Sequence, residues 1–96
     1  MKHIPNGVRV TDHTHAVRLS EDDLYTDAAT ICAMADNVGN VFVGDADVGP
    51  TSMGFYLEPK DSIPLPPRSH ISLLHNLAEV WIISENDGDG VWVAYV

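Results

Sequence analysis

Two histidines near the N-terminus are the residues whose spacing first suggests chemistry. His13 and His15 lie two positions apart, and side chains with this spacing point the same way on a β-strand. Two such imidazoles can share a metal ion, and a carboxylate with His70 or His75 would complete a cupin-like site. A polar surface strand or turn explains the same residues. We therefore predict no metal site and keep a small cupin-like metal-binding protein as an alternative.

A second group of acids has the spacing of a calcium loop. Glu85, Asp87 and Asp89 match the first three ligands of an EF-hand loop, and a glycine follows them. The last ligand position falls on Val96, which offers no carboxylate. Asp, Asn and Gly also favour tight β-turns, so we interpret these acids, and the Asp-rich loop at 45–47, as turn residues.

No residue pattern in the chain indicates a catalytic nucleophile. Cys32 has apolar neighbours and no base nearby in the sequence, which is typical of a small core residue. The serines lack the G-x-S-x-G pattern of a nucleophile elbow, and no glycine cluster fits a phosphate loop. We therefore predict a protein that is not an enzyme, with no catalytic residues and no cofactor.

The charge of the chain restricts its partners. Fourteen Asp and Glu residues face five Lys and Arg residues, which gives a net charge of -9. Affinity for nucleic acid comes mainly from basic side chains that neutralise phosphates, so we predict no direct nucleic-acid binding. The acidity either keeps the chain soluble or steers it toward a basic partner surface. No apolar run approaches the roughly 18 residues of a membrane-spanning helix, which predicts no membrane association.

Frequent glycines and prolines divide the chain into short runs rich in β-branched and aromatic residues. This pattern predicts an all-β fold, a compact antiparallel β-sandwich or jelly-roll-like structure of about seven or eight short strands. We expect an N-terminal arm or first short strand over 1–15 and a single β-sandwich domain over 16–96. Gly54 is expected to have a positive φ or close backbone packing. The expected strands are Val8–Val10, Ala16–Leu19, Ala28–Ala35, Asn40–Val43, Gly54–Leu57, Asp61–Leu65, Glu79–Ser84 and Val91–Val96.

The last two expected strands are separated by Asn, Asp and Gly residues, which predicts a C-terminal hairpin. Both arms are apolar on both faces, whereas a strand that faces solvent on one side shows a polar face there. The second face therefore needs cover, and we predict a dimer or trimer that buries it. The predicted interface comprises Trp81, Ile83, Trp92, Ala94, Tyr95 and Val96.

Two stretches resemble small virion proteins of tailed bacteriophages. The first, over 40–65, contains NVFVGD, then DV, a short Ser/Thr loop, a glycine and the pattern L-x-P-x-D-S. The second, over 76–96, contains NL, VWI and the pattern G-V-x-V-x-Y-V. The resemblance covers about residues 16–96, while the insert over 66–75 and the histidine-bearing N-terminus depart from it. It implies a compact β-sandwich with a structural role on the phage particle.

The resemblance implies a head decoration or cement protein on the surface of the virion, assembled in the host cytoplasm. Such a protein binds itself and the major capsid protein, or another virion protein, and stabilises the outer shell. An alternative is a tail, collar or fibre-associated module that binds a host glycan through Trp81, Trp92 or Tyr95. The residues expected to contact the capsid are Lys2, His3, Arg9, Arg18, Arg68 and His70.

Overall fold

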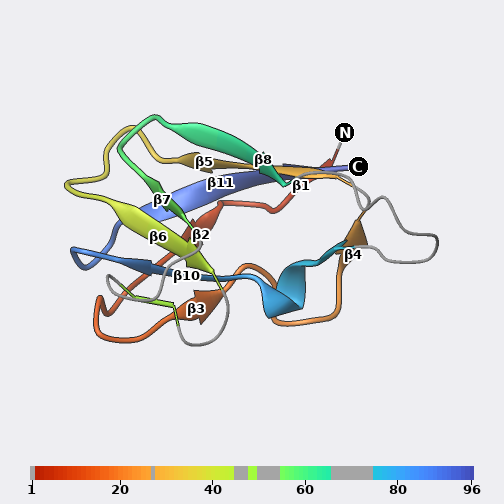
Figure 1. Cartoon of the computed structure of the whole chain (residues 1–96), viewed down its shortest axis with the longest axis horizontal. Helices are drawn as coiled ribbons and strands as arrows, with labels where there is room; N and C mark the ends of the chain where they lie inside the picture. The colour runs from red at the N-terminus through yellow and green to blue at the C-terminus, as the bar shows by residue number, and fades with distance from the viewer. Residues whose placement is uncertain (1, 27, 45–47, 50–54, 66–74) are drawn as a thin grey trace.

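The strands of this chain form two antiparallel sheets and a small two-stranded ribbon (Figure 1). The structure, a computed structural model, describes residues 2–26, 28–44, 48–49, 55–65 and 75–96. Sheet A contains β1 (Lys2–His3), β2 (Val8–Arg9), β5 (Ala29–Ala33), β8 (Ser62–Leu65) and β11 (Gly90–Tyr95). Sheet B contains β3 (Val17–Arg18), β6 (Val41–Gly44), β7 (Phe55–Leu57) and β10 (Trp81–Ser84). The ribbon pairs β4 (Tyr25–Thr26) with β9 (His75–Asn76), and a single 3₁₀ turn, η1 (Leu77–Glu79), follows it.

The prediction of an all-β, antiparallel fold is confirmed, and each of the eight expected segments contains a strand. The expected number of strands is too low, because β1, β4 and β9 were missed. These strands have two residues each, which is too short to show an alternating pattern. Gly54, whose backbone was expected to be unusual, lies outside the described residues.

Strand β11 is the centre of sheet A. It pairs with β5 along one edge, while β1 and β2 pair with the two halves of its other edge. The segment over 1–15 thus contains two short strands that join β11, and Val10, directly after β2, is fully buried. At the far side of the sheet, β8 contains Pro64. A proline has no backbone N–H to donate, and β8 lies at a sheet edge, where this is tolerated.

The core lies between the two sheets, which face each other as two layers (Figure 1). Along β5, Ala29, Ile31 and Ala33 are buried, whereas the residues between them are partly exposed. This alternation follows from the period of a strand, which sends successive side chains to opposite faces. The buried cluster comprises Val10, Leu19, Ala29, Ile31, Ala33, Val41, Val43, Leu57, Leu77, Ile82, Val91 and Val93.

The predicted C-terminal hairpin is wrong. Strand β10 pairs with β3 and β6 in sheet B, whereas β11 pairs only with strands of sheet A. The residues between them, 85–89, therefore cross from one layer to the other instead of reversing within one sheet. The Asn, Asp and Gly residues of this crossing were read as a hairpin turn, but the same conformational freedom suits a connection between layers.

A network of hydrogen bonds joins this crossing to the turn between β5 and β6, which also crosses between the layers. The two carboxylate oxygens of Asp89 accept from the backbone N–H groups of Val38 and Gly39, each at 2.9 Å. The side-chain amide of Asn37 donates to the carbonyl of Gly90 at 2.8 Å and accepts from its N–H at 2.9 Å. Asn37 and Asp89 are both buried. We call this network the Asp89 junction.

The Asp89 junction depends on a glycine at position 90. A Cβ atom at Gly90 would collide with the backbone carbonyl of Val8, because β2 packs directly against β11 at this point. Backbone atoms within a sheet cannot move aside as a flexible side chain can. The glycine is thus required by space, not by its own backbone angles.

We expect Asp89→Ala to lower the free energy of unfolding by about 3 kcal/mol. The substitution removes two hydrogen bonds to a charged group and leaves two N–H groups without a partner, and each such bond contributes roughly 1.5–3 kcal/mol. Urea denaturation measures the loss. The matched variant Glu85→Ala removes an exposed carboxylate that accepts from a single N–H, that of Asn40 at 2.8 Å, and should cost less. Equal losses for both variants would contradict the central role of Asp89.

Candidate functional site

The acids of the calcium-like pattern accept hydrogen bonds from two different turns of the chain. Glu85 accepts from the N–H of Asn40, and Asp89 accepts from the turn before β6. Asp87 instead accepts from the N–H of His13, in the N-terminal turn that precedes β3. Glu85 and Asp89 thus stabilise the same turn between β5 and β6, Asp87 stabilises the turn at His13, and the three carboxylates do not converge on one ligand.

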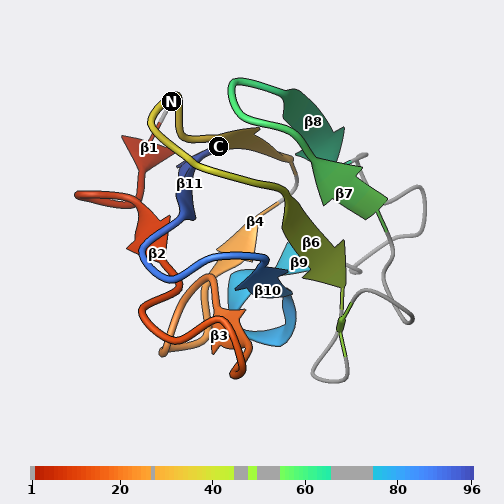
Figure 2. The same ribbon diagram turned by 90° about the vertical axis from the view of Figure 1, so that its left-hand side faces the viewer.

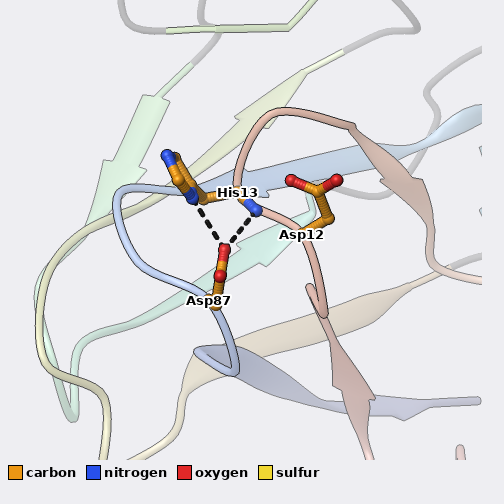
Figure 3. Close-up of side chains that lie close together, drawn as sticks. All are labelled: Asp12, His13 and Asp87. Atoms are coloured by element: carbon orange, nitrogen blue, oxygen red, sulfur yellow. Dashed lines mark hydrogen bonds and ion pairs between the residues drawn. The ribbon is translucent and has the colours of Figure 1, made fainter.

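The two histidines of the sequence pattern lie in a turn, where they meet different carboxylates. Asp87 accepts from the backbone N–H of His13 at 2.8 Å and lies 2.6 Å from its Nδ1 atom (Figure 3). His15 lies 3.1 Å from Asp12 instead. The strand geometry that would aim both rings at one metal ion is therefore absent from this part of the described chain. Of the other two candidates, His70 lies outside the described residues and His75 lies on β9.

Asp12, His13 and Asp87 are the described residues whose potential metal-ligand atoms lie within 4.8 Å of one another. All three side chains are exposed, and Figure 3 shows that the drawn bonds join Asp87 to His13 and leave Asp12 aside. Asp12 is engaged by Thr14, whose hydroxyl donates to it at 2.6 Å and whose backbone N–H donates at 3.0 Å. Both carboxylates thus already accept hydrogen bonds from residues of the histidine turn, Asp12 from Thr14 and Asp87 from His13.

An open pocket of about 680 Å³ is lined by residues of β2, β3 and β10 and of the segments beside them. Its volume is within the range of small-ligand sites in proteins. Apolar and small residues form most of the lining, with two arginines, one glutamate and one tryptophan among them. The lining residues are Ile4, Gly7, Val8, Arg9, Ala16, Val17, Arg18, Leu19, Glu21 and Trp81.

The arginines of this pocket are held in place by different contacts. The guanidinium of Arg18 lies 5.2 Å from the centre of the Trp81 ring, a cation–π arrangement. Arg9 donates to the carbonyl of Gly88 at 2.8 Å and lies 3.5 Å from the carboxylate of Asp36. Two basic residues expected to contact a partner, Arg9 and Arg18, are therefore brought together at one pocket with an aromatic residue.

A second surface lies on the outer side of sheet A, and we call it the Trp92 face. Strand register places its side chains in two adjacent rows across four strands, opposite in phase to the buried residues of the core. Trp92 is 48% exposed, and none of the side chains is an aspartate, glutamate, lysine or arginine. One row contains Trp92, Cys32 and Ser62, and the other contains His3, Ala94, Thr30 and Pro64.

The residues predicted to form one oligomer interface fall on two different sheets. Trp92 and Ala94 belong to the Trp92 face, whereas Trp81 and Ile83 lie on β10 in sheet B. Tyr95 packs against the core cluster. Val96 follows the strand, and its N–H donates to Ala28.

Of the remaining residues predicted to contact the capsid, the two that the structure describes do not line the pocket. Lys2 and His3 lie on β1 and are exposed, and neither lines the pocket. Arg68 and His70 lie outside the described residues. Glu21, which does line the pocket, had no predicted role, because its position among other acids gave no signal of a nearby arginine pair.

Comparison with protein-family models, with curated proteins and with solved structures finds no match to this chain. Within the described ranges, no helix is both long and apolar enough to cross a bilayer.

Titration of Asp12 provides a direct test of the histidine turn. The side-chain hydroxyl of Thr14, followed by its backbone N–H, lowers the pKa of Asp12 from its ordinary 3.8 to about 2. A lowered carboxyl pKa stabilises the fold above about pH 4, and this contribution is lost as the pH falls toward 2. We expect Thr14→Ala to raise the pKa of Asp12 toward its ordinary value, as followed by NMR of the carboxyl carbon. Thr14→Ser, which keeps the hydroxyl, should leave it low. An unchanged titration in Thr14→Ala would show that the hydroxyl does not control this carboxylate.

Proposed function

We propose that this chain is a non-enzymatic structural protein of a bacteriophage particle, a β-sandwich decoration or cement protein. In this role it binds the outer surface of the capsid shell as an oligomer and stabilises the shell. The observation that carries the proposal is the Trp92 face, two adjacent rows of side chains without formal charge on a chain with a net charge of -9, bordered by Arg9 in the row of Gly90.

The Trp92 face suits contact with another protein for two physical reasons. Copies of an acidic chain repel one another wherever their charged surfaces approach, so an uncharged face is where they meet at the lowest electrostatic cost. Tryptophan is also enriched at the energetically dominant centres of interfaces. Trp92 lies here on the central strand of the sheet, with small side chains, Cys32 and Ala94, near it.

The outer face of sheet B also carries aromatic side chains, and it provides a control surface for the Trp92 face. Strand register places Tyr56, Phe42 and Ile83 in one row and Arg18 beside Trp81 in the next. Tyr56 is 50% exposed, and it therefore offers a matched control for Trp92 on the opposite layer.

We expect Trp92→Asp to convert the oligomer to a monomer, because each copy would bury an unpaired carboxylate at the contact. Light scattering measures the mass, and circular dichroism checks that the fold is retained. Ala94→Glu, on the same face, should act in the same way, whereas Tyr56→Asp should leave the oligomer intact. A wild-type chain that stays monomeric at high concentration, or an oligomer that survives both face variants, would refute the interface.

The virion role itself is tested by the number of copies in purified particles of the phage that encodes the chain. A decoration protein repeats over the shell lattice, so quantitative mass spectrometry should find hundreds of copies per particle. A few copies, with labelling only at a vertex or the tail, would instead support the tail, collar or fibre-associated module. Trp81 at the rim of an open pocket is the observation that favours this second candidate, because tryptophan is suited to stacking on a sugar ring.

A further inference from the structure

The pocket near β2 and β3 combines apolar lining residues with two strand edges that no described strand pairs with. Among the described residues, β3 is the terminal strand of sheet B, and β2 pairs only with β11. Both views place β2 and β3 near each other on the same side of the molecule (Figures 1 and 2). An edge strand presents unpaired backbone N–H and C=O groups, and an incoming extended segment can pair with them.

The charge of this pocket is opposite to the charge of the chain. Arg9 and Arg18 line it together with a single acid, Glu21, so the lining has a formal charge of +1. Arg9 is already paired with Asp36 outside the lining, so Arg18, which forms no salt bridge within the described residues, is the arginine that meets an anionic partner. The whole chain has a net charge of -9. An anionic partner is therefore repelled by most of the surface and attracted to this pocket.

The contacts of Arg18 leave it suited to hold a carboxylate. Its guanidinium lies over the Trp81 ring, which restricts its motion without using its N–H groups. Arginine donates to a carboxylate through two parallel N–H groups, and such charge-assisted bonds are among the stronger ones in proteins. The partly buried Ile4, Val8 and Val17 lie beside it and offer contacts to apolar side chains.

We propose that this pocket binds an extended acidic peptide segment of a partner protein, which adds as a strand to the free edge of β3. In this arrangement a carboxylate of the segment pairs with Arg18, and its alternate apolar side chains contact the pocket floor. Strand addition provides the backbone hydrogen bonds, while the arginine and the floor provide the selectivity. The proposal goes beyond the structural role above, because no residue of the Trp92 face lines this pocket.

The probe for this site is a short blocked peptide in which valine alternates with glutamate. Calorimetry with the unmodified chain measures the affinity of the peptide. In the Trp92→Phe variant, Trp81 is the remaining tryptophan, and its fluorescence reports whether the peptide binds beside it. We expect binding that weakens with added salt, a shift of Trp81 emission, and a loss of about tenfold in affinity in Arg18→Gln. Lys2→Gln removes an equal charge outside the pocket and should leave the affinity nearly unchanged.

Three comparison ligands make the outcome decisive. A peptide with glutamine in place of glutamate should bind about tenfold more weakly, because it cannot form the ion pair. The same acidic peptide with alternate backbone nitrogens methylated should also bind weakly, because it cannot pair with β3. A sialylated trisaccharide should not shift Trp81 emission. Equal binding of the acidic and neutral peptides, full binding of the methylated one, binding of the sugar alone, or no binding of any ligand would each overturn the proposal.

Discussion

The buried carboxylate of Asp89 is the interaction on which the two-layer arrangement depends. A β-protein with two sheets must pass its chain between the layers, and each passage leaves backbone N–H groups outside any strand ladder. The buried carboxylate of Asp89 needs hydrogen-bond donors, and the N–H groups of Val38 and Gly39 in such a passage provide them. The amide of Asn37 pairs with both backbone groups of Gly90, as a neighbouring strand would. The two crossings are therefore tied to each other, and the separation of β10 from β11 follows.

Acidic residues have a consistent structural use in this chain. Asp12, Glu85, Asp87 and Asp89 each accept a hydrogen bond from a backbone N–H in a turn. Asp61 does the same for Glu58 in the turn before β8. A carboxylate used in this way is already solvated by the protein, so an acidic sequence pattern in a turn-rich β-protein is weak support for a metal site. The positive lining at Arg9 and Arg18 is more informative, because it runs against the charge of the rest of the chain.

Sequence patterns predicted the strands of this protein far better than their partners. Alternation of buried and exposed side chains marks a segment such as β5 wherever it lies, because it depends only on the period of the strand. It says nothing about which neighbour completes the ladder, and β10 and β11 were therefore paired wrongly. The pocket was beyond prediction for the same reason, since Arg18 and Trp81 are adjacent in sheet B but distant in sequence. The basic residues were recognised as candidates, but their convergence required the fold.

The position of β11 also determines when this domain can fold. Every strand that β11 joins in sheet A precedes it in the chain, and the pair of Lys2 with Tyr95 links residues far apart in sequence. During synthesis, β1, β2 and β5 leave the ribosome before the strand that connects them exists. Sheet A thus assembles only after residues 90–95 have emerged, and contacts of such long sequence separation make folding slow. Until then β5 exposes the edge that β11 later covers, so a nascent chain of this kind depends on its high net charge, or on a chaperone, to avoid aggregation.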